Sequence, residues 1–435
     1  MKIRYSLIVA VSVCLIWGLG TPGARAAGAG ASEDKEEDDG YSQISILAKA
    51  IQLLRQDYVD GNKTSYHELI TAAMKGMLAS LDPHSQYMDP NDFQDMQDDT
   101  RSRFNGLGIE VSIKNGLPTV VSPMEDTPAA RAGILSGDQI LKINGTTTDK
   151  MELQEAVNLL RGSPGQKVTL TLLRPSTKEI KEYTLERVEI KIQSVKSVHL
   201  LDKELTGLFK IGYIRLIQFN EPTADELSKA LDSLQKQGMQ ALILDLRNNP
   251  GGLLNSAVDV CGQFLSPNTK VVSTEGRVAS QQRDYTTSGV KNERPHFPMA
   301  VLINEGSASG AEIVSGALKD LHRAILIGET TFGKGSVQNV LQLPDGSAIR
   351  FTTAKYYTPG RQVIHGNGVA PNIRVPMSAE QERVVFSSRG DDLKLNQEDN
   401  LIRNEDAQML RAIDALKGVM IYAQQNAVKP ETVRK

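Results

Sequence analysis

Two short segments of this chain combine side chains that could act as a nucleophile and a base with glycines that let backbone approach a substrate. The first reads NEGSASGAE (304–312) around Ser309, and the second reads FGKGSVQ (332–338) around Lys334. A serine hydroxyl needs a base to become a nucleophile, and a lysine can act as that base when burial keeps its amine neutral. The two segments therefore predict serine hydrolase chemistry with a lysine base, a known departure from the Ser-His-Asp arrangement.

The position of Ser309 suits the negatively charged intermediate of acyl transfer. It follows an apolar strand-like run and opens a helical one, and the N–H groups at a helix start favour negative charge nearby. Gly310 could donate one of the two backbone N–H groups of an oxyanion hole. The segment DLRNNPGG (245–252) could supply the second donor from Gly251 or Gly252.

Lys334 is a better candidate for the base than any histidine. His322 is the nearest histidine after Ser309, but its place further along the same helix puts it ~20 Å away. Gln338 lies four residues after Lys334, so the two share a face of either a helix or a strand. A neutral amide at Gln338 would orient the amine without recharging it, whereas a carboxylate would raise the pKa of the amine.

Each of these residues has an ordinary alternative. Ser309 and Glu312 form the Ser-x-x-Glu pattern of a capping box, which merely starts a helix. Lys334 could be a solvated loop lysine. The segment GETTFGK (328–334) also matches the start of a P-loop, the phosphate-binding motif of many nucleotide-binding proteins. However, Gly335 stands where that motif needs Ser or Thr, and the residues after it predict a strand rather than a helix.

The bulk composition bounds the class of protein. A chain of 435 residues is expected to form about two to four domains. A net charge of −3 with 23% charged residues gives no basic field for nucleic acid, and 40% hydrophobic residues is ordinary for a globular protein. The chemistry predicted above needs no metal and no other cofactor.

The N-terminus has the layout of a secretory signal peptide. Lys2 and Arg4 precede an apolar run over 7–19, and the triplet ARA at 24–26 resembles a cleavage site. The run is short for a membrane span, which needs ~20 residues; an uncleaved anchor is the alternative. We therefore expect an exported protein that is periplasmic or membrane-associated on the outer side. After cleavage Cys261 would be the only cysteine, so no internal disulfide could form.

The hydrophobic pattern divides the chain into a β-rich module, an α/β core and helical ends. The predicted boundaries are 1–26 for the signal peptide, 27–40 for an acidic linker, 41–95 for an N-terminal helical domain, 96–190 for the β-rich module, 191–380 for the core and 381–435 for a C-terminal helical segment. The helices expected over 44–59 and 66–81 are too small for a core of their own. They must pack on another domain or another subunit.

Strands alternate with helices in the core, which predicts a largely parallel sheet. The expected strands are 211–216, 241–246, 270–273, 299–303 and 324–327, with helices over 224–237, 253–264 and 310–321. Such sheets bind ligands at the carboxyl ends of their strands. Both 245–252 and 304–312 begin at such ends, so we expect them to form one site.

A glycine-rich loop opens the β-rich module. Gly106, Leu107, Gly108 and Ile109 form a loop of the kind that can turn several N–H groups toward one carboxylate. The strand that follows can accept an extended peptide at its edge by strand addition. A plain turn is the alternative, and the segments TPAARAG (127–133) and GDQILKING (137–145) favour the binding module.

In this order, these segments resemble the carboxy-terminal processing proteases, also called tail-specific proteases. SLDPHS (80–85) looks like the N-terminal signature of that family, 106–174 is similar to its PDZ domain, and 245–252, 304–312 and 332–338 resemble its three core motifs. The resemblance covers nearly the whole mature chain. It implies a multidomain α/β protein with a crotonase-like core, a PDZ domain and helical segments at both ends.

The resemblance also implies roles for single residues. These are Ser309 as nucleophile, Lys334 as general base, Gln338 as its orienting partner, Gly251 or Gly252 with Gly310 as the oxyanion hole, and Arg161 as the residue that carries a gating signal from the PDZ domain. Many relatives have Ala where this chain has Gly310, a change that keeps the N–H donor.

The hypothesis from the sequence is an exported serine endopeptidase that binds the C-terminal tail of a protein substrate in its PDZ domain and cuts nearby. Its partners would be proteins or peptides with accessible tails, further copies of the chain bound through the terminal helices, and an adaptor protein where one exists. Nucleic acid is not expected as a partner. The alternatives are a non-catalytic scaffold that only binds tails, and a P-loop-like nucleotide-binding protein.

Overall fold

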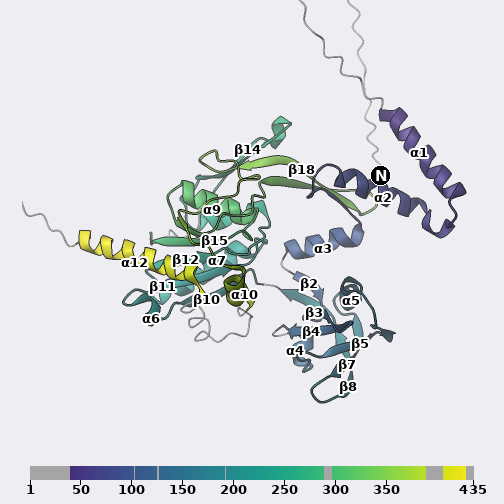
Figure 1. Cartoon of the computed structure of the whole chain (residues 1–435), viewed down its shortest axis with the longest axis horizontal. Helices are drawn as coiled ribbons and strands as arrows, with labels where there is room; N and C mark the ends of the chain where they lie inside the picture. Colours follow the sequence, from purple (N-terminus) through teal and green to yellow (C-terminus); the bar gives the residue numbers. More distant parts are fainter. Residues whose placement is uncertain are drawn as a thin grey trace, which may run out of the picture. The chain divides into compact units, whose positions relative to one another are not determined.

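The computed structural model describes residues 40–101, 103–124, 127–191, 193–288, 296–387 and 405–427 (Figure 1). The chain divides into two compact units, the first up to Ile70 and the second from Thr71 on. The predicted signal peptide lies outside the described residues, as does the acidic linker apart from Gly40. None of the described helices is long and apolar enough to cross a bilayer.

The first unit is helical and buries little. It holds α1 (Gly40–Asp57), the 3₁₀ turn η1 (Gly61–Lys63) and the start of α2 (Tyr66–Ala79). No side chain of α1 is buried. The apolar side chains Ile44, Leu47 and Leu54 of α1, and Tyr58 just after it, are all exposed, although they recur at helical spacing. The unit therefore has apolar side chains that stay exposed within the described part of the chain.

The β-rich module packs a five-strand antiparallel path, ordered β3-β4-β5-β7-β8, around its own core. Its elements are β2 (Arg103–Gly106), β3 (Ile109–Lys114), β4 (Leu117–Pro123), α4 (Pro128–Arg131), β5 (Gln139–Ile143), β6 (Thr146–Thr147), α5 (Leu153–Leu160), β7 (Lys167–Arg174), β8 (Glu179–Glu186) and β9 (Val188–Lys191). β6 pairs with β5, and β2 pairs separately with β9. Because β3 lies at the end of the path, one of its edges is open within the described sheet.

The second unit also contains a six-stranded α/β sheet, ordered β10-β11-β12-β15-β16-β19. Its elements are β10 (Val195–Leu200), α6 (Lys203–Thr206), β11 (Ile211–Leu216), α7 (Thr223–Lys236), β12 (Ala241–Asp245), α8 (Leu254–Gly262), β15 (Met299–Ile303), α9 (Gly310–Asp320), β16 (Ile325–Gly328), β19 (Ile373–Arg374), α10 (Ala379–Ser387) and α12 (Ala407–Ala427). β10 pairs antiparallel with β11, and the other pairs are parallel. The parallel sheet predicted from the sequence is therefore present.

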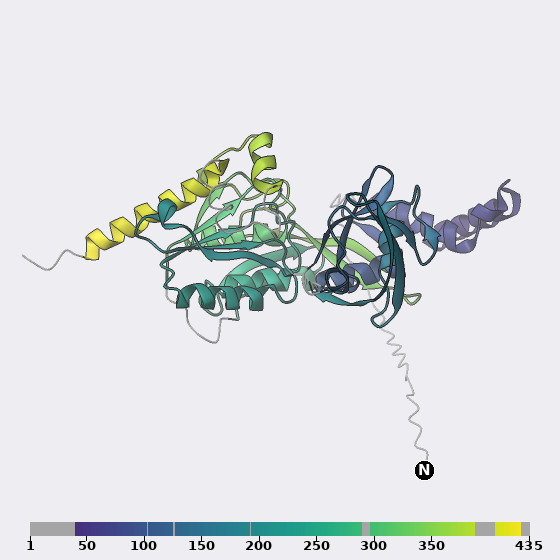
Figure 2. The same cartoon turned by 90° about the horizontal axis from the view of Figure 1, so that it is seen from below.

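Helices cover both faces of this sheet, which explains why its central strands are apolar on both sides. In Figure 2 the teal helix α7 lies on one side of the strands and the yellow helix α12 on the other. α7 buries Leu227, Leu231 and Leu234, while α12 buries Ile413 and Leu416. Both sets recur every three or four residues, so each helix has one apolar face toward the sheet.

A second, antiparallel sheet lies beside the first and corrects one prediction. The run expected as the parallel strand 270–273 is β13 (Lys270–Gly276), which pairs antiparallel with β14 (Arg283–Thr286) and β18 (Ala348–Tyr357). The pattern of apolar residues locates a strand but does not say which sheet it joins. The sheet also contains β1 (Gln86–Met88) and β17 (Ser336–Gln342), both paired with β18.

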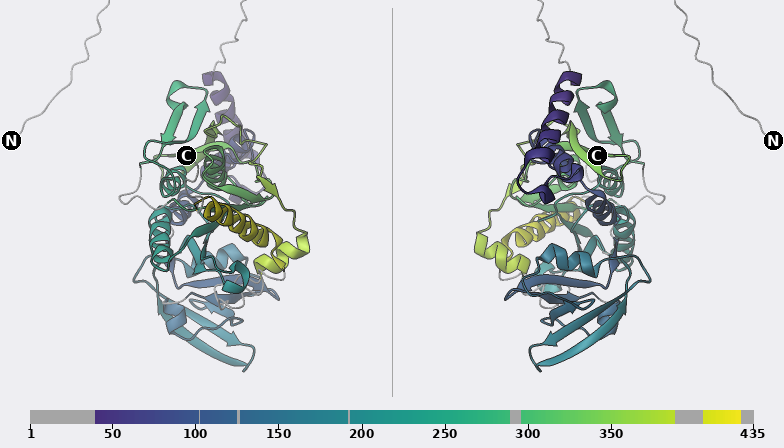
Figure 3. Two further views of the ribbon diagram at one scale, coloured as in Figure 1. Left: turned by 90° about the vertical axis from the view of Figure 1, so that its left-hand side faces the viewer. Right: turned by 90° about the vertical axis from the view of Figure 1, so that its right-hand side faces the viewer.

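An ion cluster buried between α12 and the sheet fixes the C-terminal helix. Figure 3 shows this helix in dark yellow beside the α/β sheet. The Arg247 guanidinium is 0% exposed and donates to both carboxylate oxygens of Asp245 and of Asp406 at 2.7–3.0 Å. Asp406 also accepts the N–H of Met409, so it caps the start of α12. The cluster therefore joins α12 to the loop that follows β12.

Cys261 is fully buried in α8, among the apolar side chains between α8 and the sheet. Burial raises the pKa of its thiol, since the thiolate would lose its hydration there. Cys261 is therefore a small residue of the apolar core rather than a reactive thiol.

Candidate active site

The carboxyl ends of β12 and β15 meet at one edge of the parallel sheet. The side-chain amide of Asn304 donates to the side-chain oxygen of Asn248, and its own oxygen accepts the N–H of Asn248, each at 2.8 Å. The Ser307 hydroxyl donates to the carbonyl of Leu246 at 2.8 Å. The two motifs that the sequence places at strand ends are therefore bound to one another, as expected for neighbouring parallel strands.

Ser309 occupies a strained position at the start of α9. Its backbone has φ 51° and ψ −111°, a region that residues with a side chain rarely adopt. Its hydroxyl makes no capping hydrogen bond, whereas its N–H donates to Glu312 Oε2 at 2.8 Å. Only the Glu312 half of the capping box is thus formed. The Ser309 hydroxyl is left available for other chemistry.

The Glu312 carboxylate is the most heavily hydrogen-bonded group of the site. Oε2 accepts the N–H groups of Ser309 and Lys334, each at 2.8 Å. Oε1 accepts the Thr331 hydroxyl at 2.6 Å and the Gly333 N–H at 2.7 Å. Burial raises the pKa of this carboxyl, and the four hydrogen bonds oppose that shift. One side chain therefore connects the segments of Ser309 and Lys334.

The environment of Lys334 favours a neutral amine. Its side chain is half-buried, and burial together with the nearby charge of Arg350 lowers the pKa of the amine, while the charge of Glu312 opposes this. No hydrogen bond joins the amine to the Ser309 hydroxyl among the described residues. Such bonds are often long in ligand-free enzymes and tighten when substrate binds.

Gln338 lies on β17. It does not share one face of a regular strand with Lys334, although the spacing of four residues predicts this. Lys334 precedes the strand, which begins at Ser336, and a bulge between Val337 and Gln338 shifts the register with β18. The Gln338 amide donates to the Thr352 hydroxyl at 2.7 Å and to the Ser336 hydroxyl at 3.3 Å. Its oxygen Oε1 is buried without a partner, so it is open to a donor such as a lysine amine.

The backbone hydrogen bonds distinguish between the two glycines predicted as the second donor of the oxyanion hole. The N–H of Gly251 already donates to the Asn249 side chain at 2.9 Å. In contrast, the N–H groups of Gly252 and Gly310 have no acceptor within the described part of the chain. A Cβ placed on Gly310 would lie 3.4 Å from the Gly252 nitrogen, so the two peptides are neighbours. Gly252 is thus a better second donor than Gly251.

The segment SLDPHS contacts the base side of the site, a connection that sequence reasoning did not predict. Asp82 accepts the Ser85 hydroxyl at 2.8 Å, and Ser85 Oγ accepts the N–H of Thr352 at 3.3 Å. Thr352 in turn accepts the amide of Gln338. Burial and the charge of Lys334 lower the pKa of His84.

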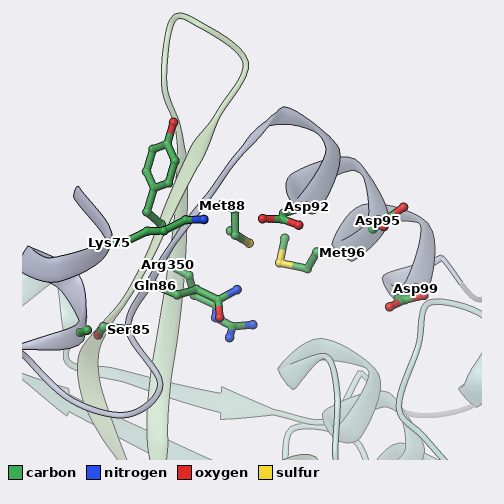
Figure 4. A pocket seen from close by; sticks show the side chains of 11 residues that line it. Lys75, Ser85, Gln86, Met88, Asp92, Asp95, Met96, Asp99 and Arg350 are labelled. Atoms are coloured by element: carbon green, nitrogen blue, oxygen red, sulfur yellow. The ribbon is translucent and has the colours of Figure 1, made fainter. Parts of the chain in front are cut away.

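A cavity of about 590 Å³ adjoins these residues (Figure 4). One wall is α3 (Pro90–Thr100), a helix that the sequence did not predict. It contributes Asp92, Asp95 and Asp99, and Figure 4 shows Arg350 with Gln86 across from them. Arg350 lines this cavity and also lowers the pKa of Lys334, so the cavity lies next to the surroundings of Lys334.

The glycine-rich loop of the β-rich module has backbone N–H groups without an acceptor in the described part of the chain. Gly106 ends β2, Leu107 is buried, Gly108 has φ +74°, and Ile109 begins β3. The N–H groups of Leu107 and Gly108 have no acceptor among the residues that the structure describes. β3 has an open edge in its sheet. The helix α5 contacts the strand β3. The loop and strand thus present unpaired donors on one side of the module.

Arg161 connects the β-rich module to α3. It is the residue that ends α5, and its guanidinium forms an ion pair with Asp95 at 2.5 Å. It also lies over the ring of Phe104 at 5.8 Å. Both members of the ion pair are partly exposed, and Asp95 lines the cavity next to the base.

The nucleotide-binding alternative lacks its structural context. In the segment GETTFGK, Gly328 ends β16 and the residues after Lys334 form the strand β17. A P-loop needs a helix there, whose N-terminus binds phosphate. Within the described ranges, no cluster of His, Cys, Asp and Glu could hold a metal ion.

Sequence reasoning found the residues at strand ends and missed those that reach the site from elsewhere. Glu312 was considered only as a helix cap. Arg350 and Thr352 belong to no sequence motif, because they lie on β18 and approach Lys334 and Gln338 through the pairing of β18 with β17. The signal for Glu312 was its place three residues after Ser309; no local signal marks the other two.

Three family profiles match separate parts of the chain. The sequence profile of Peptidase family S41 matches residues 210–375, that of the PDZ domain matches 119–174, and that of the N-terminal domain of the activating protease CtpB matches 22–92. The chain is 42% identical over 345 residues to a carboxy-terminal-processing protease of Bartonella bacilliformis, covering 78% of this chain and 76% of that one.

Two further similarities are with the carboxy-terminal processing protease CtpA of Bacillus subtilis and with a solved structure. The first is 37% identical over 344 residues, which cover 79% of this chain and 71% of the relative. The second is a photosystem II D1 C-terminal processing protease, 28% identical, with a TM-score of 0.49 over 85% of this chain and 99% of that one. The sequence relatives confirm the family predicted from the motifs: the chain belongs to the carboxy-terminal processing proteases, which are serine peptidases, and it carries a PDZ domain.

Proposed function

We propose that this protein is an exported endopeptidase in which Ser309 is the nucleophile, Lys334 the general base and Gln338 the residue that orients the amine. The observation that carries this assignment is the pair of hydrogen bonds to Glu312 Oε2. Since the N–H groups of Ser309 and Lys334 donate to the same oxygen at 2.8 Å, their nitrogens lie within two hydrogen-bond lengths of each other. A lysine side chain can span that separation to reach the hydroxyl.

The reaction follows from these positions. The Lys334 amine takes the Ser309 proton as Oγ forms a bond with the substrate carbonyl carbon. The N–H groups of Gly252 and Gly310 stabilise the oxyanion of this tetrahedral intermediate. The protonated amine then gives its proton to the leaving nitrogen as the C–N bond breaks. Water attacks the acyl-enzyme in the same way, with Lys334 as its base, and restores Ser309.

We propose further that the PDZ domain binds the C-terminal carboxylate of the substrate at Gly106–Ile109 and adds the tail as a strand on β3. The free N–H groups of that loop and the open edge of β3 support this. The cavity between α3 and β18 would then hold the substrate segment between tail and cleaved bond. Arg161 would carry the gating signal, because its ion pair with Asp95 links the PDZ domain to this cavity.

Export, a crotonase-like core and assembly belong to the same proposal. The signal-peptide layout of 1–26 supports export, to the periplasm or the outer side of a membrane. The order of the parallel strands with helices on both faces supports the crotonase-like core. The uncovered apolar side chains of α1 support a homo-oligomer that joins through terminal helices. An adaptor protein is a further partner that this arrangement allows.

The test uses purified protein and an unstructured substrate with a nonpolar tail. Ser309→Ala, Lys334→Ala and Lys334→Arg should each lose at least about 10⁴-fold in kcat. Arginine fails in place of Lys334 because it cannot lose its proton at working pH. All three variants should still bind the tail. Cleavage at the wild-type rate in any of them would refute the assignment, and tail binding without cleavage by the wild type would favour a scaffold.

A further inference from the structure

Glu312 neither gives nor takes a proton in the reaction described above. Glu312 is 0% exposed, lies in the first turn of α9 and contacts backbone on both sides of the site. We infer that Glu312 is a positioning residue whose single carboxylate sets the distance between nucleophile and base. The inference rests on the assignment of Ser309 and Lys334 proposed above and goes beyond it.

The four partners of Glu312 all donate, and they come from two separate segments. Ser309 belongs to the start of α9, whereas Thr331, Gly333 and Lys334 belong to the loop between β16 and β17. An ionised carboxylate offers acceptor sites on both oxygens, while an amide offers them on one. A glutamine would turn its NH₂ group toward two N–H or O–H donors. The ionised acid is therefore the form that fits this set.

The fold does not depend on this carboxylate alone. The N–H of Phe332 donates to the carbonyl of Ser307 at 3.0 Å, which also joins the two segments. Thr331 exchanges hydrogen bonds with the backbone of Val369, at 2.7 and 3.2 Å. Loss of the carboxylate should thus leave the loop between β16 and β17 folded, but the loop should be able to shift slightly relative to α9. A shift of about 1 Å between reacting groups is enough to slow an enzyme about 100-fold.

Glu312 also acts on the charge of the base. Asp82 and His365 act on His84, which in turn faces Lys334. The groups whose charges act on Lys334 directly are Glu312 from α9, Arg350 from β18 and His84 from the segment before β1. Of these, only Glu312 is an acid, and its charge raises the pKa of the Lys334 amine. Activity requires the neutral amine, so it rises as the pH passes the pKa of Lys334. Without the charge of Glu312 this rise should occur at lower pH.

The experiment separates position from charge with two substitutions. Glu312→Gln keeps the size and removes the charge, so kcat should fall about 100-fold and the alkaline rise in activity should move to lower pH. Glu312→Asp keeps the charge but shortens the side chain by one methylene. Its kcat should also fall, with the rise in activity at its wild-type pH. KM should change little in either, because the tail-binding residues are untouched.

A matched control is Glu226→Gln. Glu226 lies on α7, away from the site, and its Oε2 accepts the N–H groups of Ser194 and Val195 at 2.8 and 3.2 Å. This variant should melt at a lower temperature but keep the kcat and pH profile of the wild type. It therefore shows what the loss of a merely structural carboxylate does.

Wild-type kcat in both Glu312 variants, with Ser309→Ala and Lys334→Ala inactive, would overturn this inference and leave the proposed function intact. So would a fall in kcat in Glu312→Gln with no movement of the pH profile. If Glu312→Gln does not fold, Glu312→Asp decides alone through its kcat. Activity that persists in Lys334→Ala would instead overturn the proposed function.

Discussion

Arg247 and Lys334 are two cations taken out of water within one α/β core, and their surroundings are opposite. Arg247 is fully buried between Asp245 and Asp406, and these charges hold the pKa of its guanidinium above the usual range despite burial. Lys334 is half-buried and faces another cation, Arg350, so the pKa of its amine falls. The first side chain is fixed in its charged form, and the second is prepared to lose its proton.

The comparison shows that partners, rather than burial alone, decide what a buried cation does. Two carboxylates and good geometry make Arg247 a structural joint between α12 and the loop that leads to Gly252. Burial, a like charge and only one carboxylate, already engaged by backbone donors, leave the pKa of the Lys334 amine lowered. Substitutions that change the charged partners of Arg247 or Lys334 should therefore change the stability of the fold or the pKa of the amine.

Of the substitutions that test this comparison, the largest effect is expected at Arg247, on the free energy of unfolding. Arg247→Met leaves Asp245 and Asp406 buried without their counter-ion, and breaking such a pair should reduce the free energy of unfolding by about 3–5 kcal/mol. Urea unfolding followed by the fluorescence of the tyrosines measures it. The control is Lys270→Met, because its ion pair with Asp284 is exposed and worth about 0–1 kcal/mol. Equal losses in both variants would contradict the contrast drawn here.

A smaller effect is expected at Arg350. Arg350→Gln removes the cation that faces Lys334, so the pKa of the amine should rise and the rise in activity should move to higher pH. The initial rate of cleavage over a pH series measures this. Arg361→Gln is the control, since Arg361 is exposed and pairs with Glu275. A profile that stays in place in Arg350→Gln would show that Arg350 does not act on the base.

The smallest of these effects is expected at Gln338. Gln338→Glu replaces the neutral amide with a carboxylate, which should raise the pKa of Lys334 and reduce kcat at neutral pH by about 10-fold. At high pH, where the amine is neutral in both proteins, the variant should approach the wild-type rate. Gln338→Leu, which removes the amide altogether, should instead be slower at every pH. The two profiles therefore separate the charge at this position from its hydrogen bonds.

Much of the fold could be predicted from local patterns. The expected strands 211–216 and 299–303 coincide with β11 and β15, because buried parallel strands are short, apolar and bounded by turns. The strand over 270–273 was also located but was assigned to the wrong sheet. Pairing partners are set by long-range contacts, which one sequence does not display.

The candidate site was also only partly predictable, because some of its residues meet only through long-range contacts. Ser309 and Lys334 stand out through glycines and strand ends, and they prove to share one hydrogen-bond acceptor. The residues that tune them were hidden for two different reasons. Glu312 is explained locally as a helix cap, and Arg350 reaches the site only because β18 pairs with β17.

The burial of Cys261 has a practical consequence. A thiol reagent reacts with the thiolate, and the native core both excludes the reagent and suppresses that form. In a chain from which residues 1–26 have been removed, Cys261 is the only cysteine. The rate at which such a reagent labels the protein would then measure how often α8 separates from the sheet, without any engineered probe.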